Sequence, residues 1–154
     1  MLKGKYVILE IIPTKVCNGE IAQLSALKID NLKLIDRFDY RLNKKLISNK
    51  QILDMTNYDN DKFIYCDSTK DILINFKKFI SNYTLLIIDN QYTRNYLSTI
   101  KNKKESILKY LNMTYSDDII FTIEKKYNIV PTNYIVDILY EAILYEDGDN
   151  NGNS

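Results

Sequence analysis

The sequence predicts an α/β fold with a mixed sheet of about five strands, three antiparallel and then parallel, flanked by helices. Three consecutive apolar or alternating stretches, at 6–12, 20–29 and 32–42, are separated by short turns, as is typical of an antiparallel meander. A helical stretch follows them, and then a further apolar strand at 84–89. A helix between two strands favours a right-handed parallel crossover.

Each of the first three strands has its own signal. Residues 6–12 read YVILEII, a β-branched apolar run that stops at Pro13. Asp30-Asn31 is a two-residue turn signal between the second and third strands. The third strand, at 32–42, alternates between two faces, which carry Phe38, Tyr40 and Leu42, and Arg37, Asp39 and Arg41.

Most of the remaining chain reads as helix. Ser68 is a candidate N-cap with Asp71 three residues later, close to a capping box. We also expect a short helix near 51–55, helices after the strand at 84–89, and a last helix that starts at Pro131. The apolar residues that predict the first long helix and the last one are Ile72, Leu73, Phe76, Phe79 and Ile80, and Ile135, Ile138, Leu139 and Ala142.

Length and composition indicate one folded domain at 1–146 and a polar, disordered tail at 147–154. Hydrophobic residues make up 45% and charged residues 27% of the chain, as in ordinary globular proteins. The net charge of +1 gives no overall basic field to attract nucleic acid. No stretch approaches the roughly 20 apolar residues of a membrane span, so we expect no membrane partner and a cytoplasmic location.

Several reaction classes are excluded by residues that the chain lacks. There is no histidine, which rules out Ser-His-Asp triads, Cys-His pairs and imidazole metal sites. Cys17 and Cys66 have no metal-ligand spacing and are expected as thiols in a reducing compartment. The four glycines form no phosphate-binding loop.

The order and spacing of several stretches resemble the DnaQ-like (DEDD) 3′–5′ exonucleases, a family with the ribonuclease H-like fold. YVILEIIPT stands where that family has a strand ending in Asp-x-Glu, and MTNY where it has a Leu-Thr-Gly-Ile turn. LLIIDNQYTRNYL and PTNYIVDILYEAIL resemble the segments that carry its third and fourth acids, and STKDILINFKKFI resembles an intervening helix. The resemblance covers Tyr6 to about Leu144 and implies a ribonuclease H-like domain.

In this family four acids hold two Mg²⁺ ions about 3.5–4 Å apart, and a histidine or tyrosine near the last acid handles the attacking water. The resemblance places Glu10 at the first acid and Asp137 at the fourth. Ile12 occupies the second position and cannot bind a metal. The third position falls on Thr93 or Arg94, depending on where one deleted residue is placed, and neither is a carboxylate.

The water-activating residue is also missing. The histidine position holds Thr132 and the tyrosine position holds Asn133. Tyr134 lies one residue further, which on a helix turns its hydroxyl by roughly 100°. Two carboxylates cannot neutralise two closely spaced divalent ions, so the resemblance implies a catalytically degenerate domain.

The leading interpretation is therefore an exonuclease-like domain that has lost catalysis and binds single-stranded nucleic acid or a protein partner. No cofactor is expected, and Mg²⁺ or Mn²⁺ would bind at Glu10 and Asp137 only with residual activity. Tyr92 and Arg94 are the candidate nucleic-acid contacts. The alternative is an active metal-dependent 3′–5′ exonuclease with a non-standard site of Glu10 and Asp137, with or without Asp89.

Two further interpretations stay open at this point. The chain could be an interaction protein that uses only the surface of the scaffold. Glu10 also has a purely structural interpretation, as a strand acid that meets solvent or a lysine, and Asp137 has one as a solvated residue on the polar face of its helix.

Overall fold

A computed structural model describes residues 2–15, 19–56, 62–132 and 134–152, and of the last four of these it places only the backbone. The described residues form one six-stranded mixed sheet in the order β4-β3-β2-β1-β5-β6. The strands are β1 (Lys5–Pro13), β2 (Ile21–Asp30), β3 (Lys33–Leu42), β4 (Ile64–Cys66), β5 (Thr84–Ile87) and β6 (Lys104–Ser106).

The pairing within this sheet confirms the predicted α/β class with antiparallel and then parallel strands. β1, β2 and β3 form the antiparallel meander, and β5 pairs with β1 in parallel. Two parallel edge strands, β4 and β6, have no counterpart among the strands located in the sequence, and with them the described sheet has six strands where about five are predicted. Each has three residues, too few for a periodic pattern to be recognised in the sequence.

The helices occupy most of the predicted places. Ser68 caps α2, because its hydroxyl oxygen accepts a hydrogen bond from the backbone nitrogen of Asp71 at 3.1 Å. The last helix begins at Ile135 and continues through Gly152, into the segment that the sequence assigns to a disordered tail. The helices are η1 (Lys44–Leu46, a 3₁₀ turn), α1 (Lys50–Met55), α2 (Thr69–Phe79), α3 (Gln91–Tyr96), α4 (Ile107–Tyr110), α5 (Ile119–Tyr127) and α6 (Ile135–Gly152).

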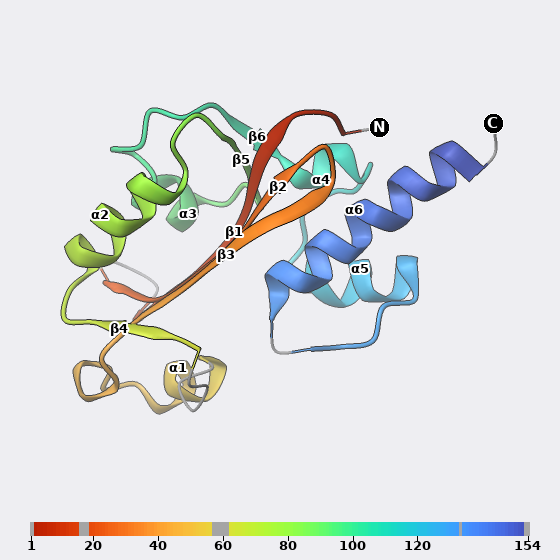
Figure 1. Cartoon of the computed structure of the whole chain (residues 1–154). Coiled ribbons are helices and arrows are strands. Elements are labelled where there is room, and N and C mark those ends of the chain that lie inside the picture. The colour runs from red at the N-terminus through yellow and green to blue at the C-terminus, as the bar shows by residue number, and fades with distance from the viewer. Residues whose placement is uncertain (1, 16–18, 57–61, 133, 153–154) are drawn as a thin grey trace.

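Helices cover both faces of the sheet, with α2 on one side and α5 and α6 on the other (Figure 1). Alternation along β1 distributes its side chains between two cores. The core on the α2 side contains Val7, Leu9, Ile11, Phe38, Ile72 and Phe76. The core on the α5 and α6 side contains Ile8, Leu27, Ile123, Ile138 and Leu139. Within the described residues, no helix combines the length and apolarity that a membrane crossing requires.

Phe76 tests the packing of α2 on the sheet. Its ring is fully buried and lies edge-on to Phe38 of β3 at 5.4 Å between centroids. We expect Phe76→Ala to lower the free energy of unfolding by about 3–5 kcal/mol, because it leaves a cavity in the core. Ile74, 44% exposed on the same helix, provides the control. Urea unfolding in which Ile74→Ala costs as much as Phe76→Ala would contradict this packing.

Candidate functional site

A cleft lies beside the middle of β1, where three elements that are distant in sequence meet. It consists of two adjoining hollows with volumes of about 460 and 260 Å³. Glu10 of β1, Tyr92 of α3 and Ile135 of α6 border both hollows. The segments that resemble the first, third and fourth exonuclease motifs therefore meet at one cleft.

Glu10 reaches this cleft because of the alternation along β1. Leu9 and Ile11 belong to the core under α2, so the side chain between them lies on the face that α5 and α6 cover. Glu10 forms no hydrogen bond or ion pair with a described side chain, and burial raises its pKa to about 8. An unpaired carboxyl group in such surroundings favours its neutral form, whereas a cation beside it would favour the charged form.

Three further carboxylates line the cleft, and the sequence motifs did not indicate them. They are Asp54 at the end of α1, Asp117 just before α5, and Glu124 within α5. None of them forms an ion pair with a described residue, and no lysine or arginine is among the described residues that line the two hollows. The described side chains that line the cleft therefore include four acids and no basic group, and the buried Arg41 donates a hydrogen bond to Thr56 of the lining at 3.1 Å.

Tyr92 is the one candidate nucleic-acid contact that lines the cleft. Burial raises the pKa of its phenol, and the nearby Glu10 carboxylate raises it further. Asn90 starts α3 by accepting a hydrogen bond from the backbone nitrogen of Thr93 at 3.0 Å, and Thr93 itself is buried. This capping fixes the start of α3 and so places Tyr92 at the cleft.

Arg94 and Asp89 pair with each other away from the cleft. The guanidinium of Arg94 donates two hydrogen bonds to the Asp89 carboxylate, and these lower the pKa of Asp89. Asp89 lines a separate hollow of about 440 Å³ together with Ser106 and Lys109. The structure thus does not bring Arg94 to Tyr92 in the cleft, nor Asp89 to Glu10.

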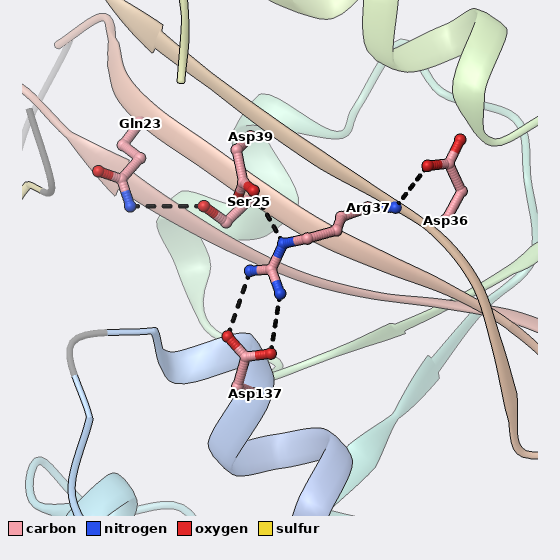
Figure 2. Close-up of polar contacts among 6 residues, drawn as sticks. All are labelled: Gln23, Ser25, Asp36, Arg37, Asp39 and Asp137. Carbon is pink, nitrogen blue, oxygen red and sulfur yellow. Dashed lines mark hydrogen bonds and ion pairs between the residues drawn. The ribbon is translucent and has the colours of Figure 1, made fainter. Parts of the chain in front are cut away.

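Asp137 is held by an arginine of β3. Its two carboxylate oxygens accept hydrogen bonds from Nη1 and Nη2 of Arg37 at 3.0 and 3.2 Å (Figure 2). Nε of the same arginine donates to Asp39 Oδ2 at 2.9 Å. Burial lowers the pKa of Arg37, but the bonds to Asp137 and Asp39 more than offset this and raise it overall. Asp137 does not line the cleft that Glu10 borders.

Asp39 belongs to a polar row that crosses the sheet beneath α6. The register pairs Glu10 with Ser25 and Ser25 with Asp39, so the three side chains share one face. Asp39 is buried, and its Oδ1 has no hydrogen-bond partner among the described residues. The alternation of β3 placed Asp39 on a polar face, but the sequence did not reveal that α6 covers this face.

The positions that would activate water do not supply a base. Thr132 is exposed at the cleft, and Asn133 lies outside the described residues. The ring of Tyr134 stacks on Phe63 at 6.3 Å between centroids, and the Arg37 guanidinium lies over it at 5.4 Å. Tyr134 therefore packs beside the Arg37 pair, near the edge of the sheet.

The residues at the cleft do not fit a two-metal centre. Ile12 joins an apolar cluster with Ala22, Leu42 and Ile47, and it offers no oxygen ligand. Within the described part of the chain, no three His, Cys, Asp or Glu side chains gather closely enough to hold a metal ion.

Comparison with the models of known protein families and with curated proteins finds no match for this chain.

Glu10→Gln tests the environment of the carboxyl group. Because its folded pKa is raised to about 8, the neutral form stabilises the fold below the unfolded pKa, and this stability is lost as the pH rises toward 8. As the pH rises from 4.5 to 8, we expect the glutamine variant to gain up to about 5 kcal/mol of unfolding free energy over the parent chain, measured by chemical denaturation. Glu141→Gln, at an exposed position of α6, should show no such gain. If the unfolding free energies of the parent chain and of Glu10→Gln changed with pH in the same way, the raised pKa of Glu10 would be contradicted.

The ion pairs of Arg37 predict that removing the arginine lowers the unfolding free energy more than removing Asp137 does. Arg37→Ala leaves Asp39 buried without its cationic partner, so we expect a loss of about 2–4 kcal/mol in unfolding free energy. Asp137→Ala removes a half-exposed partner and should cost about 1 kcal/mol or less. Arg94→Ala, in the surface pair with Asp89, should leave stability nearly unchanged. Equal losses at Arg37 and Asp137 would show that Asp39 does not depend on Arg37.

Proposed function

We propose that this chain is a non-catalytic domain of the DnaQ-like, ribonuclease H-like type that serves as a protein-interaction module. The observation that carries the proposal is the cleft at Glu10. It stands where the resemblance puts the exonuclease centre, yet only one of the four acid positions contributes a carboxylate to it.

The sheet supports the ribonuclease H-like part of this proposal. Three antiparallel strands are extended on the β1 side by the parallel strands β5 and β6, as the resemblance implies. The helix α2 connects β4 to β5 on one face of the sheet, and the closing helix α6 packs across the other face (Figure 1). These features agree with the fold expectation along most of the chain.

The geometry disfavours the alternative of an active exonuclease with a non-standard site. That site needs Glu10 together with Asp137, with or without Asp89. Asp137 is paired with Arg37 and Asp89 with Arg94, so each carboxylate is neutralised by an arginine instead of a metal ion. Glu10 alone offers too little charge to hold a pair of divalent cations.

The lining of the cleft favours a protein over a nucleic acid as the partner. Lysine and arginine supply most of the affinity of proteins for phosphate groups, and neither is among the described residues of the lining. Large apolar and aromatic side chains remain accessible at the cleft instead: Met55 is 59% and Tyr115 47% exposed. Aromatic residues and methionine are enriched at protein–protein interfaces.

A nuclease assay tests the loss of catalysis. We expect no difference between the parent chain and Glu10→Ala in Mg²⁺- or Mn²⁺-dependent digestion of single-stranded DNA and RNA, because the paired metal centre lacks its ligands. Digestion by the parent chain that Glu10→Ala abolishes would overturn the proposal. Any digestion that both proteins share comes from a co-purifying nuclease.

Site-specific photocrosslinking tests the interaction surface. A benzophenone amino acid in place of Tyr115, in an extract of the cells that produce the chain, should give a discrete protein adduct. The same group in place of Ile74, exposed on α2 at the opposite face, is the matched control. The proposal fails if the adducts at position 115 are nucleic acid, or if the two positions give the same adducts.

A further inference from the structure

The cleft has a chemical character more specific than a general protein-binding surface. Glu10 borders both hollows, has no partner among the described residues, and has its carboxyl group withdrawn from water. Keeping a carboxylate charged where water is largely excluded costs free energy, unless an occupant of the cleft supplies the opposite charge. Glu10 is half-buried and has no partner among the described residues, and three other acids stand at the walls of the cleft. Both observations favour a cationic occupant.

The occupant must also match the apolar part of the cleft. Ile120 and Ile135 border both hollows, and Met55 lies beside them. Tyr92 and Tyr115 add aromatic rings at the same place. A small inorganic cation would leave this surface without contacts, whereas a cation on an aliphatic stem would cover it.

We propose that the cleft receives an arginine side chain of a protein partner, with its guanidinium group at Glu10 and its aliphatic stem against the apolar wall. This inference rests on the proposed interaction function and specifies what enters the cleft. A guanidinium group provides five donors in a planar fork, which matches the two oxygens of a carboxylate such as that of Glu10. It also stacks on aromatic rings, and two tyrosines line the smaller hollow.

The two hollows are large enough to admit a long side chain together with part of the segment that carries it. Their volumes are about 460 and 260 Å³, and the accessible apolar residues beside them would contact the residues that flank the arginine. Asp54, Asp117 and Glu124 lie around this entrance and favour a basic segment over an acidic one.

The test uses the full chain and two small probes that differ only in charge. Nα-acetylarginine N-methylamide carries the guanidinium, and Nα-acetylcitrulline N-methylamide is its neutral isostere. In titrations followed by amide chemical shifts, we expect the arginine probe to perturb residues around the cleft with a Kd on the order of 1 mM. The citrulline probe should bind about tenfold more weakly or worse, because it leaves Glu10 uncompensated.

Variants connect the binding to the carboxyl group. Glu10→Gln should weaken the arginine probe by about tenfold, whereas Glu141→Gln, exposed on α6, should not change its affinity. Equal affinity for the two probes, no effect of Glu10→Gln, or tighter binding of the corresponding lysine probe would each overturn the assignment. A protein adduct at position 115 without arginine binding would show that the interaction function holds and this occupant is wrong.

Discussion

The site depends on the ion pairs that Arg37 forms with Asp39 and Asp137. Arg37 lies on β3, holds the buried Asp39 of its own strand, and clamps Asp137 near the start of α6. Through these contacts one guanidinium ties the closing helix to the meander across the polar row of the sheet (Figure 2). The same contacts take Asp137 away from any role at Glu10. The resemblance to exonucleases makes Asp137 a metal ligand, whereas in this structure Asp137 anchors α6 to β3 through Arg37.

The cleft differs from the site of a two-metal nuclease in its electrostatics. In a two-metal nuclease, several acids are compensated by divalent ions and the substrate is polyanionic. Here Glu10 has no partner among the described residues, Ile12 stands where the resemblance puts the second acid, and the described lining holds further carboxylates but no lysine or arginine. Such a cleft repels phosphate and favours a cationic, partly apolar occupant. The proposed function therefore follows from the charge and the apolar character of the cleft.

Much of the fold could be predicted from the sequence, because long elements have clear periodicity. The alternation in β3 and the capping of α2 by Ser68 are local signals, and both are present in the structure. β4 and β6 depend on neighbouring strands for their hydrogen bonds, and three residues leave no pattern. The position of Glu10 at a cleft followed from the resemblance. The partner of Asp137 did not, because Arg37 lies 100 residues away in the chain and only the packing of α6 reveals it.

The most direct test of this account is a Mn²⁺ titration of the parent chain observed by NMR. Paramagnetic broadening of amide signals reports where the ion sits, without reference to catalysis. Because Asp137 is bonded to Arg37 and does not line the cleft, we expect the broadening at the cleft to be the same, residue by residue, in the parent chain and in Asp137→Asn. Saturable broadening around Glu10 in the parent chain that Asp137→Asn abolishes would contradict this account, because the two carboxylates would then share an ion.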